Sequence, residues 1–262
     1  MPATPQQKAE RLRELHRADG AFVIANAWDA GSAKALVGLG FAALATSSGA
    51  AAGVLGRKDG EITRAEAIAH ARAIVDAVEL PVSADLENGF GDAPEDCART
   101  IREAGAIGLA GGSIEDCGGV AQRTIYPFAL AVERVAAAAD AARALPHPFV
   151  LTARCENLLR GVSDLDDTIR RLQAYAKAGA DVLFAPALPD LAAVRTLCAA
   201  VDRPVNFMVG LKGKSFSVAE LQAAGVKRIS LATSLYRAAM AGMLQAAREV
   251  QEQGRFGYVE RL

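Results

Sequence analysis

The residues best suited to chemistry lie in the stretch 82–92, Val-Ser-Ala-Asp-Leu-Glu-Asn-Gly-Phe-Gly-Asp. A short apolar run leads there into two carboxylates, Asp85 and Glu87, and then into a glycine loop. A third acid, Glu115, follows the next apolar run along the chain. Ionised carboxylates cannot share a pocket without a counter-charge, and oxygen ligands suit a hard cation such as Mg²⁺. The three acids therefore predict a magnesium site.

Polar residues also end other apolar runs. Arg154 follows the fifth run, and a guanidinium fork binds a carboxylate through two parallel hydrogen bonds. The turn at 46–49, Thr-Ser-Ser-Gly, offers hydroxyls and backbone N–H groups for an oxyanion. A metal chelated by a 2-oxo acid would polarise the keto oxygen and stabilise an enolate when the bond to the third carbon breaks. The sixth and eighth runs end in fewer polar residues.

Eight short apolar runs alternate with longer helical segments along the chain. Most of these runs are continuously apolar, which is typical of parallel strands that are covered on both faces. If the strands form a barrel, their carboxyl ends bring the polar residues that end the apolar runs to one face of the barrel. The predicted strands are 22–26, 42–46, 82–85, 107–114, 149–153, 182–185, 205–207 and 228–232.

The segments between the strands carry helix signals. Thr63-x-x-Glu66 and Ser217-x-x-Glu220 fit capping boxes at helix starts, and Gly179 is placed to close a helix before a strand. Eight βα units in a chain of this length match the size of an α/β TIM barrel, the (β/α)8 fold. We predict a single barrel domain over residues 1–262, with extra C-terminal helices from about 235 to 262.

A doubly wound sheet is the alternative fold, but its phosphate-binding motifs are absent. Gly89-x-Gly91 has Pro94 where a dinucleotide fingerprint needs its third glycine. Met208 stands where a P-loop ending at Gly213-Lys-Ser would need its first glycine. We therefore prefer the barrel.

Composition and charge exclude several classes of function. The chain has 262 residues, 52% of them hydrophobic, and a formal net charge of −1. This balance gives no reason to expect a nucleic-acid or membrane partner. The first twenty residues lack the apolar core of a signal peptide and predict a short amphipathic helix. The four cysteines form no C-x-x-C pair and predict no disulfide framework. We therefore expect a cytoplasmic protein.

Taken in order, the strand-end motifs resemble the phosphoenolpyruvate mutase / isocitrate lyase superfamily over nearly the whole chain, from about residue 22 to the C-terminal helix. The resemblance implies a (β/α)8 barrel, Mg²⁺ or Mn²⁺, and 2-oxo-acid substrates that pass through an enolate. The matching motifs are Asp-x-Glu-x-Gly-x-Gly at 85–91, Ile-Glu-Asp at 114–116, Thr-Ser-Ser-Gly at 46–49 followed by Asp59, Ala-Arg at 153–154 and Pro-Val-Asn at 204–206.

The resemblance also implies residue roles. Asp85 matches the direct metal ligand, and Glu87 and Glu115 match acids that hold the metal through its waters. Asp59 matches the acid on a mobile loop that closes over the site, and Arg154 matches the arginine at the substrate. The implied catalytic residues are Asp59, Arg154 and Glu115, and the implied substrate-binding residues are Trp28, Ser47, Ser48, Gly49, Arg154 and Asn206.

Family members commonly form tetramers in which a C-terminal helix is exchanged between subunits. The resemblance thus implies a homotetramer or homodimer, with residues from about 235 to 262 exchanged.

Departures from the family motifs bear on the activity. Glu87 replaces the usual Asp, and the loop after the fourth strand lacks the Lys-(Lys/Arg)-Cys-Gly-His motif of isocitrate and methylisocitrate lyases. Cys117 has no basic residue before it and no histidine after it, and neighbouring acids would raise its pKa. The lysine and asparagine of mutases are also missing, with Gln122 and Arg123 as the polar substitutes. Asp116 is expected to be an ordinary loop residue or helix cap.

We predict a Mg²⁺-dependent carbon–carbon lyase that cleaves a small 2-oxo acid such as oxaloacetate, by decarboxylation or a retro-aldol reaction, through a metal-stabilised enolate. One alternative is a phosphoenolpyruvate mutase or phosphonopyruvate hydrolase that acts at a C–P bond. An alternative of another class is a non-catalytic descendant that binds a ligand.

Overall fold

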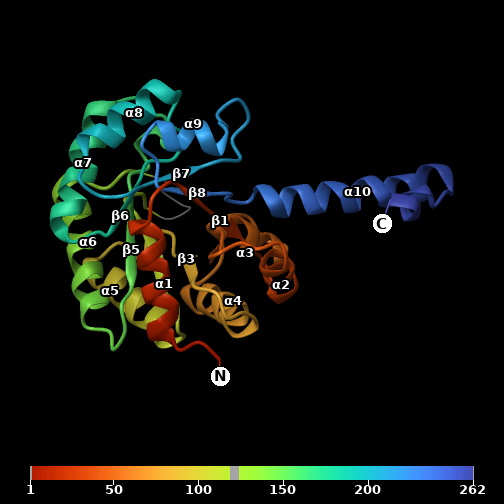
Figure 1. The fold of residues 1–262 in the computed structure, drawn as a ribbon, viewed down its shortest axis with the longest axis horizontal. Helices are drawn as coiled ribbons and strands as arrows, with labels where there is room; N and C mark the ends of the chain where they lie inside the picture. Colours follow the sequence, from red (N-terminus) through yellow and green to blue (C-terminus); the bar gives the residue numbers. More distant parts are fainter. Residues whose placement is uncertain (1, 119–123, 262) are drawn as a thin grey trace.

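The computed structural model describes residues 2–118 and 124–261. Eight parallel strands form a closed barrel in the order β1 to β8, and β8 pairs back onto β1 (Figure 1). The predicted (β/α)8 barrel is therefore confirmed. The strands are β1 (Phe22–Asn26), β2 (Leu44–Ala45), β3 (Val82–Asp85), β4 (Gly111–Glu115), β5 (Val150–Arg154), β6 (Val182–Phe184), β7 (Val205–Met208) and β8 (Arg228–Ser230).

Helices connect the strands and surround the barrel (Figure 1). The helix α1 precedes the first strand and α10 follows the last one. The helices are α1 (Pro5–Arg17), α2 (Ala30–Gly38), α3 (Ser48–Val54), α4 (Arg64–Ala77), α5 (Pro94–Ala106), α6 (Phe128–Arg143), α7 (Leu165–Ala178), α8 (Leu191–Ala200), α9 (Val218–Ala223) and α10 (Ser234–Gln253), with 3-10 turns η1 (Asn157–Arg160) and η2 (Gly257–Arg261).

Four strands, β2, β4, β6 and β8, are shorter than the sequence predicts, and the difference is largest for β2 and β4. The predicted strand 42–46 keeps only Leu44–Ala45, and the predicted strand 107–114 begins at Gly111. Gly108 has a left-handed φ of +84° directly after α5, and Leu109 is fully buried in the core. Apolar residues of this turn are therefore as buried as those of the strand. Burial alone does not show where the strand begins, because ladder pairing decides that point.

The predicted capping boxes are present. The Thr63 hydroxyl accepts the backbone N–H of Glu66, and the Glu66 carboxylate accepts the backbone N–H of Thr63. Ser217 and Glu220 form the same pair at the start of α9. Gly179 closes α7 with a φ of +112°, in the left-handed region that favours glycine. These signals are local, which is why the sequence alone identifies them.

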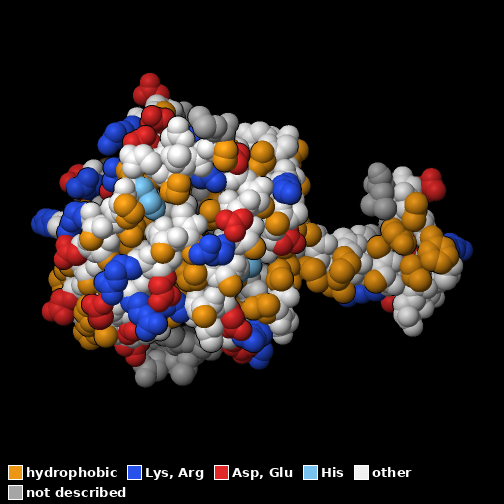
Figure 2. All heavy atoms as spheres, turned by 90° about the horizontal axis from the view of Figure 1, so that it is seen from below, with side chains coloured by type: hydrophobic (Ala, Val, Ile, Leu, Met, Phe, Trp, Pro, Cys, Tyr) orange, Lys and Arg blue, Asp and Glu red, His pale blue; other side chains and the backbone are white. Residues whose placement is uncertain are grey.

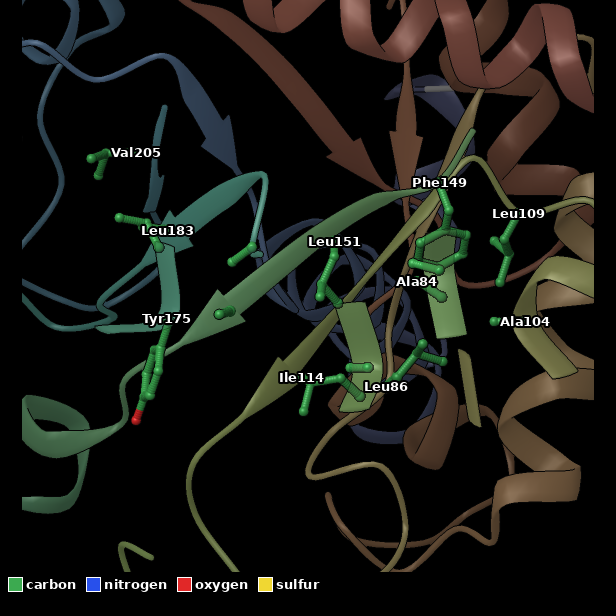
Figure 3. Close-up of a cluster of buried hydrophobic side chains, with 14 of the residues drawn as sticks. Ala84, Leu86, Ala104, Leu109, Ile114, Phe149, Leu151, Tyr175, Leu183 and Val205 are labelled. Carbon is green, nitrogen blue, oxygen red and sulfur yellow. The ribbon is translucent and has the colours of Figure 1, made fainter. Parts of the chain in front are cut away.

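The main hydrophobic core lies between the sheet and the helices. Figure 3 shows Leu86, Ile114, Leu151 and Tyr175 within this layer. A smaller cluster fills the amino-terminal end of the barrel, where Leu12 of α1 packs with residues such as Val150. The N-terminal helix predicted from the sequence therefore lies across one end of the barrel and leaves the carboxyl-terminal end for chemistry.

Helix α10 extends away from the barrel (Figure 1). It is 20 residues long, and none of its residues is buried. Across residues 2–118 and 124–261, no helix combines the length and apolar character that a membrane span requires.

Candidate active site

A cavity of about 230 Å³ opens at the carboxyl ends of the strands. Side chains from most of the eight strands and the loops after them line it. A second cavity of about 110 Å³ shares several of its lining residues. Asp85, Asn206 and Ser47 line the larger cavity, Glu87 and Glu115 line the smaller one, and Ser48, Asp59 and Arg154 line both.

Asp85 lies at the end of β3 with both carboxylate oxygens engaged. The backbone N–H of Ser48 donates to Oδ2 at 3.1 Å, and Nη1 of Arg154 donates to Oδ1 at 3.1 Å. The backbone N–H of Asp85 donates in turn to Oγ1 of Thr46 at 3.0 Å. The turn at 46–49, Asp85 and Arg154, which the sequence predicts to be functional, are thus in direct contact.

Glu87 is half-buried beside other acids, and the positive charge of Arg154 offsets only part of their effect on its pKa. Its backbone has a φ of +50°, a conformation that non-glycine residues seldom adopt. Burial, followed by the charges of Asp85 and Asp59, raises the pKa of Glu87 to about 8. Its Oε1 atom is buried and has no hydrogen-bond partner among the described residues. A carboxylate held in this way is suited to a cation, either directly or through a water molecule.

The three predicted metal-site acids do not converge on one point. Within the described residues, no group of three or more His, Cys, Asp or Glu side chains is arranged to hold a metal ion. Glu115 is directed at arginines instead, with Oε2 at 3.2 Å from Nη2 of Arg154 and Oε1 at 3.7 Å from Nη2 of Arg160. The oxygen-only donors and the orphaned Glu87 oxygen nevertheless fit Mg²⁺, which keeps several waters and needs few protein carboxylates.

Arg154 is the centre of the charge network. Besides Asp85 and Glu115, it contacts Oε1 of Glu156 at 2.8 Å, and the Glu156 side chain is fully buried. Burial alone would lower the pKa of Arg154, but the three carboxylates raise it above the ordinary value. Burial and the Glu156 charge raise the pKa of Glu115. The guanidinium also lies 4.9 Å from the ring centre of Phe184, so its position is fixed on several sides.

The turn at 46–49 is held from two directions. Oγ of Ser47 lies 3.0 Å from Oγ1 of Thr233, at the start of α10. A Cβ atom at Gly49 would lie 3.0 Å from the same Thr233 oxygen and 3.4 Å from Cγ of Asp59. Glycine therefore lets Asp59 and Thr233 approach the turn closely, which explains the Ser-Gly sequence here.

The remaining predicted residues lie at different distances from the cavity. Asn206 lies inside the barrel, where its Nδ2 donates to Oγ of Ser230 at 3.1 Å. Trp28 packs edge-on against Tyr236 of α10, with ring centres 5.8 Å apart, and is not among the residues that line either described cavity. The predicted site residues other than Trp28 and Gly49 thus line one or both cavities, and Gly49 lies beside them against Asp59.

Sequence reasoning assigned no role to three charged residues of the site. Glu156 and Arg160 are four residues apart and form an ion pair at 3.2 Å, a spacing that could have identified them. Arg228 lies at the start of β8 and points into the barrel, where it lines the larger cavity. It escapes attention because only residues at the carboxyl ends of strands are expected to carry function.

Asp116 has a structural role, although it is not the solvated residue that the sequence suggests. It is buried, and its carboxylate accepts hydrogen bonds from Tyr175 Oη at 2.5 Å and from the backbone N–H of Glu156 at 2.8 Å. Burial, and to a lesser degree Glu115 and Glu156, raises the pKa of the neighbouring Cys117 to about 11. Cys117 is therefore a poor acid–base group at neutral pH. Gln122 and Arg123 lie outside the described residues.

Comparisons with known proteins agree with this geometry. The sequence model of the family described as phosphoenolpyruvate phosphomutase matches residues 12–251. A 2-methylisocitrate lyase of Escherichia coli is 35% identical over 202 residues, which cover 74% of this chain and 67% of that protein.

Solved structures give the same result. The crystal structure of a Burkholderia cenocepacia J2315 protein, described in general terms as a lyase/mutase, is 52% identical with a TM-score of 0.95 and covers 98% of this chain and 92% of that one. The structure of oxaloacetate acetylhydrolase in complex with the inhibitor 3,3-difluorooxalacetate is 26% identical with a TM-score of 0.88. The match covers 97% of this chain and 89% of that one. The chain therefore belongs to the phosphoenolpyruvate mutase / isocitrate lyase superfamily, and it is an enzyme whose named relatives include carbon–carbon lyases.

Proposed function

We propose that the protein is a Mg²⁺-dependent carbon–carbon lyase that acts on a small 2-oxo acid such as oxaloacetate. The observation that carries the proposal is the direct contact of Asp85 with Arg154 and with the turn at 46–49 at the edge of the cavity. This contact joins a carboxylate suited to a metal, an arginine suited to a carboxylate, and a turn whose backbone N–H groups are suited to an oxyanion. The superfamily relatives support this class of substrate, since one is named for oxaloacetate, a 2-oxo acid, and another for 2-methylisocitrate, a hydroxy acid that yields the 2-oxo acid pyruvate when it is cleaved.

The residues of this chain divide the work of such a reaction. Asp85 would bind the cation directly, and Glu87 and Glu115 would hold its waters. When bound, Mg²⁺, or Mn²⁺ in its place, supplies a Lewis acid that polarises a keto oxygen. Arg154 and the Ser47–Gly49 turn would bind the carboxylate beside the keto group.

Asp59 is the best-placed residue to move a proton or to close the site. It lines both cavities and lies against Gly49, yet it is exposed and belongs to no helix or strand. An acid on such a segment can approach the substrate after binding and deliver a proton to the carbon from which the bond has broken.

A C–P bond reaction is the second candidate, and the observation that favours it is the match to the family named for phosphoenolpyruvate phosphomutase. In that case the phosphonate group would need a polar partner on the loop after β4. The residues proposed for this, Gln122 and Arg123, lie outside the described residues.

A coupled dehydrogenase assay of pyruvate release tests the proposal. Oxaloacetate, phosphonopyruvate and 2-methylisocitrate would each be tested with Mg²⁺, with a chelator, and with the Asp85→Ala protein. We expect release from oxaloacetate that the chelator abolishes and that Asp85→Ala lowers to the rate without enzyme; the variant is needed because free metal also decarboxylates oxaloacetate. Full activity in chelator would refute the metal role, and release from phosphonopyruvate alone would favour the C–P reaction. Ligand binding without any turnover would favour a non-catalytic descendant.

We also propose that the protein is a homotetramer or homodimer in which α10 packs on a neighbouring subunit. Figure 2 shows hydrophobic side chains along the projecting arm formed by α10 and η2. The exposed apolar residues of this arm are Met243, Leu244, Val250, Phe256 and Val259. A second copy of the chain would cover this surface.

A further inference from the structure

Arg228 is a buried cation inside the barrel without an acidic partner. Only 5% of the residue is exposed. Its Nε donates to Oδ1 of Asn206 at 2.8 Å, and its Nη2 donates to Oγ1 of Thr152 at 3.0 Å. Its Nη1 has no partner among the described residues. Both acceptors are neutral, so nothing described in the fold balances the positive charge.

Two other largely buried arginines are paired with carboxylates, whereas the buried Arg134 donates to backbone carbonyls such as that of Gly91 at 2.9 Å. Arg154 contacts three carboxylates, and Arg171 contacts Asp116 at 3.3 Å and Asp167 at 2.8 Å. A buried charge without a compensating partner is costly, and Arg228, with two neutral acceptors and an unpartnered Nη1 among the described residues, is therefore suited to bind an anion. Burial lowers the pKa of Arg228 to about 9, and the side chain therefore remains positively charged at neutral pH.

The cavity reaches Arg228 because the barrel interior is incompletely filled at this depth. Ser83 of β3, Ser113 of β4 and Ser230 of β8 point inward and line the cavity together with Arg228. Small hydroxyl side chains replace the bulky aliphatic residues that usually fill a barrel. The result is a polar space lined by hydroxyl groups beside a guanidinium that has no carboxylate partner among the described residues, which is the chemistry that binds a carboxylate.

The depth of this space suits the far end of a short substrate. Thr152, which Arg228 contacts, precedes Arg154 by two residues on β5, so both face the interior one layer apart. Two residues span about 6.6 Å along a parallel strand. An acid bound by Arg154 and the turn at 46–49 can therefore extend a few carbons into the barrel toward Arg228.

We propose that Arg228 binds the second carboxylate of the substrate, the one remote from the keto group, and so selects 2-oxo diacids over 2-oxo monoacids. This inference rests on the proposed function, because it assumes that an acid occupies the cavity. A site with Arg228 would select 2-oxo diacids, whereas the residues at the strand ends alone indicate only a 2-oxo acid.

Binding of two stable hydroxy acids tests the inference without turnover. L-malate and L-2-hydroxybutyrate differ only in the fourth carbon, which is a carboxylate in the first and a methyl group in the second. Each would be titrated by calorimetry into the Mg²⁺-loaded full-length protein. We expect the wild type to bind malate at least tenfold more tightly than 2-hydroxybutyrate, since a charged hydrogen bond contributes at this level.

Two variants assign the preference to Arg228. Arg228→Met removes the charge with a side chain of similar length. It should weaken the affinity for malate ten- to hundredfold and change the affinity for 2-hydroxybutyrate less than threefold. Arg228→Lys keeps the charge and should retain a preference for malate. If Arg228→Met weakens the affinity for both ligands equally, Arg228 has a structural role and the inference is overturned.

The titration of the wild type tests the inference even if Arg228→Met does not fold. Equal affinity of the wild type for the two ligands, or binding of neither, would also overturn the inference. If the same protein releases pyruvate from oxaloacetate, the proposed function survives that result and only the role of Arg228 is wrong.

Discussion

Arg154 is the residue on which the site most depends, because three carboxylates and a ring fix its position. Arg154→Lys keeps the charge but loses the planar fork that binds a carboxylate through two bonds. We expect kcat/KM for oxaloacetate to fall about ten- to hundredfold, the loss that charged hydrogen bonds of this kind produce. The matched control is Arg57→Lys, at an exposed ion pair with Glu66. Comparable activity of both variants would contradict the role of Arg154.

Gly49 offers a sharper residue-level test, since a single methyl group is added. The Cβ of Gly49→Ala would approach Thr233 Oγ1 at 3.0 Å and Asp59 Cγ at 3.4 Å, so it should displace Asp59 from the turn. We expect at least a tenfold loss of kcat with a thermal midpoint within a few degrees of wild type. Gly38→Ala is the control, because a Cβ there meets nothing within 4 Å. Unchanged kcat in Gly49→Ala would show that the position of Asp59 is unimportant.

The sequence predicts the site residues that stand where strands end, and misses those that act from elsewhere. Asp85, Glu115 and Arg154 follow apolar runs, so the position of each is evident from its neighbours along the chain. Arg228 begins a strand instead, and its importance depends on which residues face it across the barrel. Such pairings between distant strands have no local signal.

At the scale of elements, α1 and the strand it contacts make the stability depend on pH. His16 packs against Phe22 with ring centres 5.0 Å apart, and burial followed by the Arg228 charge lowers its pKa to about 3. The folded state therefore binds fewer protons than the unfolded state below pH 6.5, and stability is lost as the pH falls from about 6.5 toward 3.

By pH 5 this single group should cost about 2 kcal/mol of unfolding free energy, at 1.36 kcal/mol for each pH unit below 6.5. Urea unfolding of wild type and His16→Gln at pH 7.5 and pH 5 measures the effect. The variant should lose less stability than wild type between the two pH values. An equal loss in both proteins would show that His16 is not the group responsible.

The elements themselves follow closely from the sequence, and the exceptions have a physical cause. The ranges predicted for β1 and β3 match the structure, because each apolar run ends in a polar residue, Asn26 or Asp85. β4 begins later than predicted because Ile107 and Leu109 are buried in a turn that resembles a strand in composition. A sequence records that a residue is apolar, but it does not record whether a helix or a neighbouring strand covers it.

At the scale of the molecule, α10 is predicted to hold subunits together. Leu244 is 46% exposed on the projecting helix, and Leu244→Glu would place a charge in the proposed interface. Light scattering after gel filtration should show a smaller assembly than wild type, because burying an unpaired charge is costly. Gln245→Glu adds the same charge 100° further around the helix and should leave the assembly unchanged. A wild-type monomer, or identical assemblies in all three proteins, would refute the proposed exchange.

The position of α1 has a kinetic consequence. Because Leu12 and its neighbours fill the amino-terminal end of the barrel, substrate and products share the mouth at the carboxyl-terminal end. A cleavage reaction makes two products from one substrate, and the fragment held deeper in the barrel must wait until the outer fragment has departed. Release is then ordered, so the deeper fragment should inhibit competitively against substrate and the outer fragment should inhibit noncompetitively.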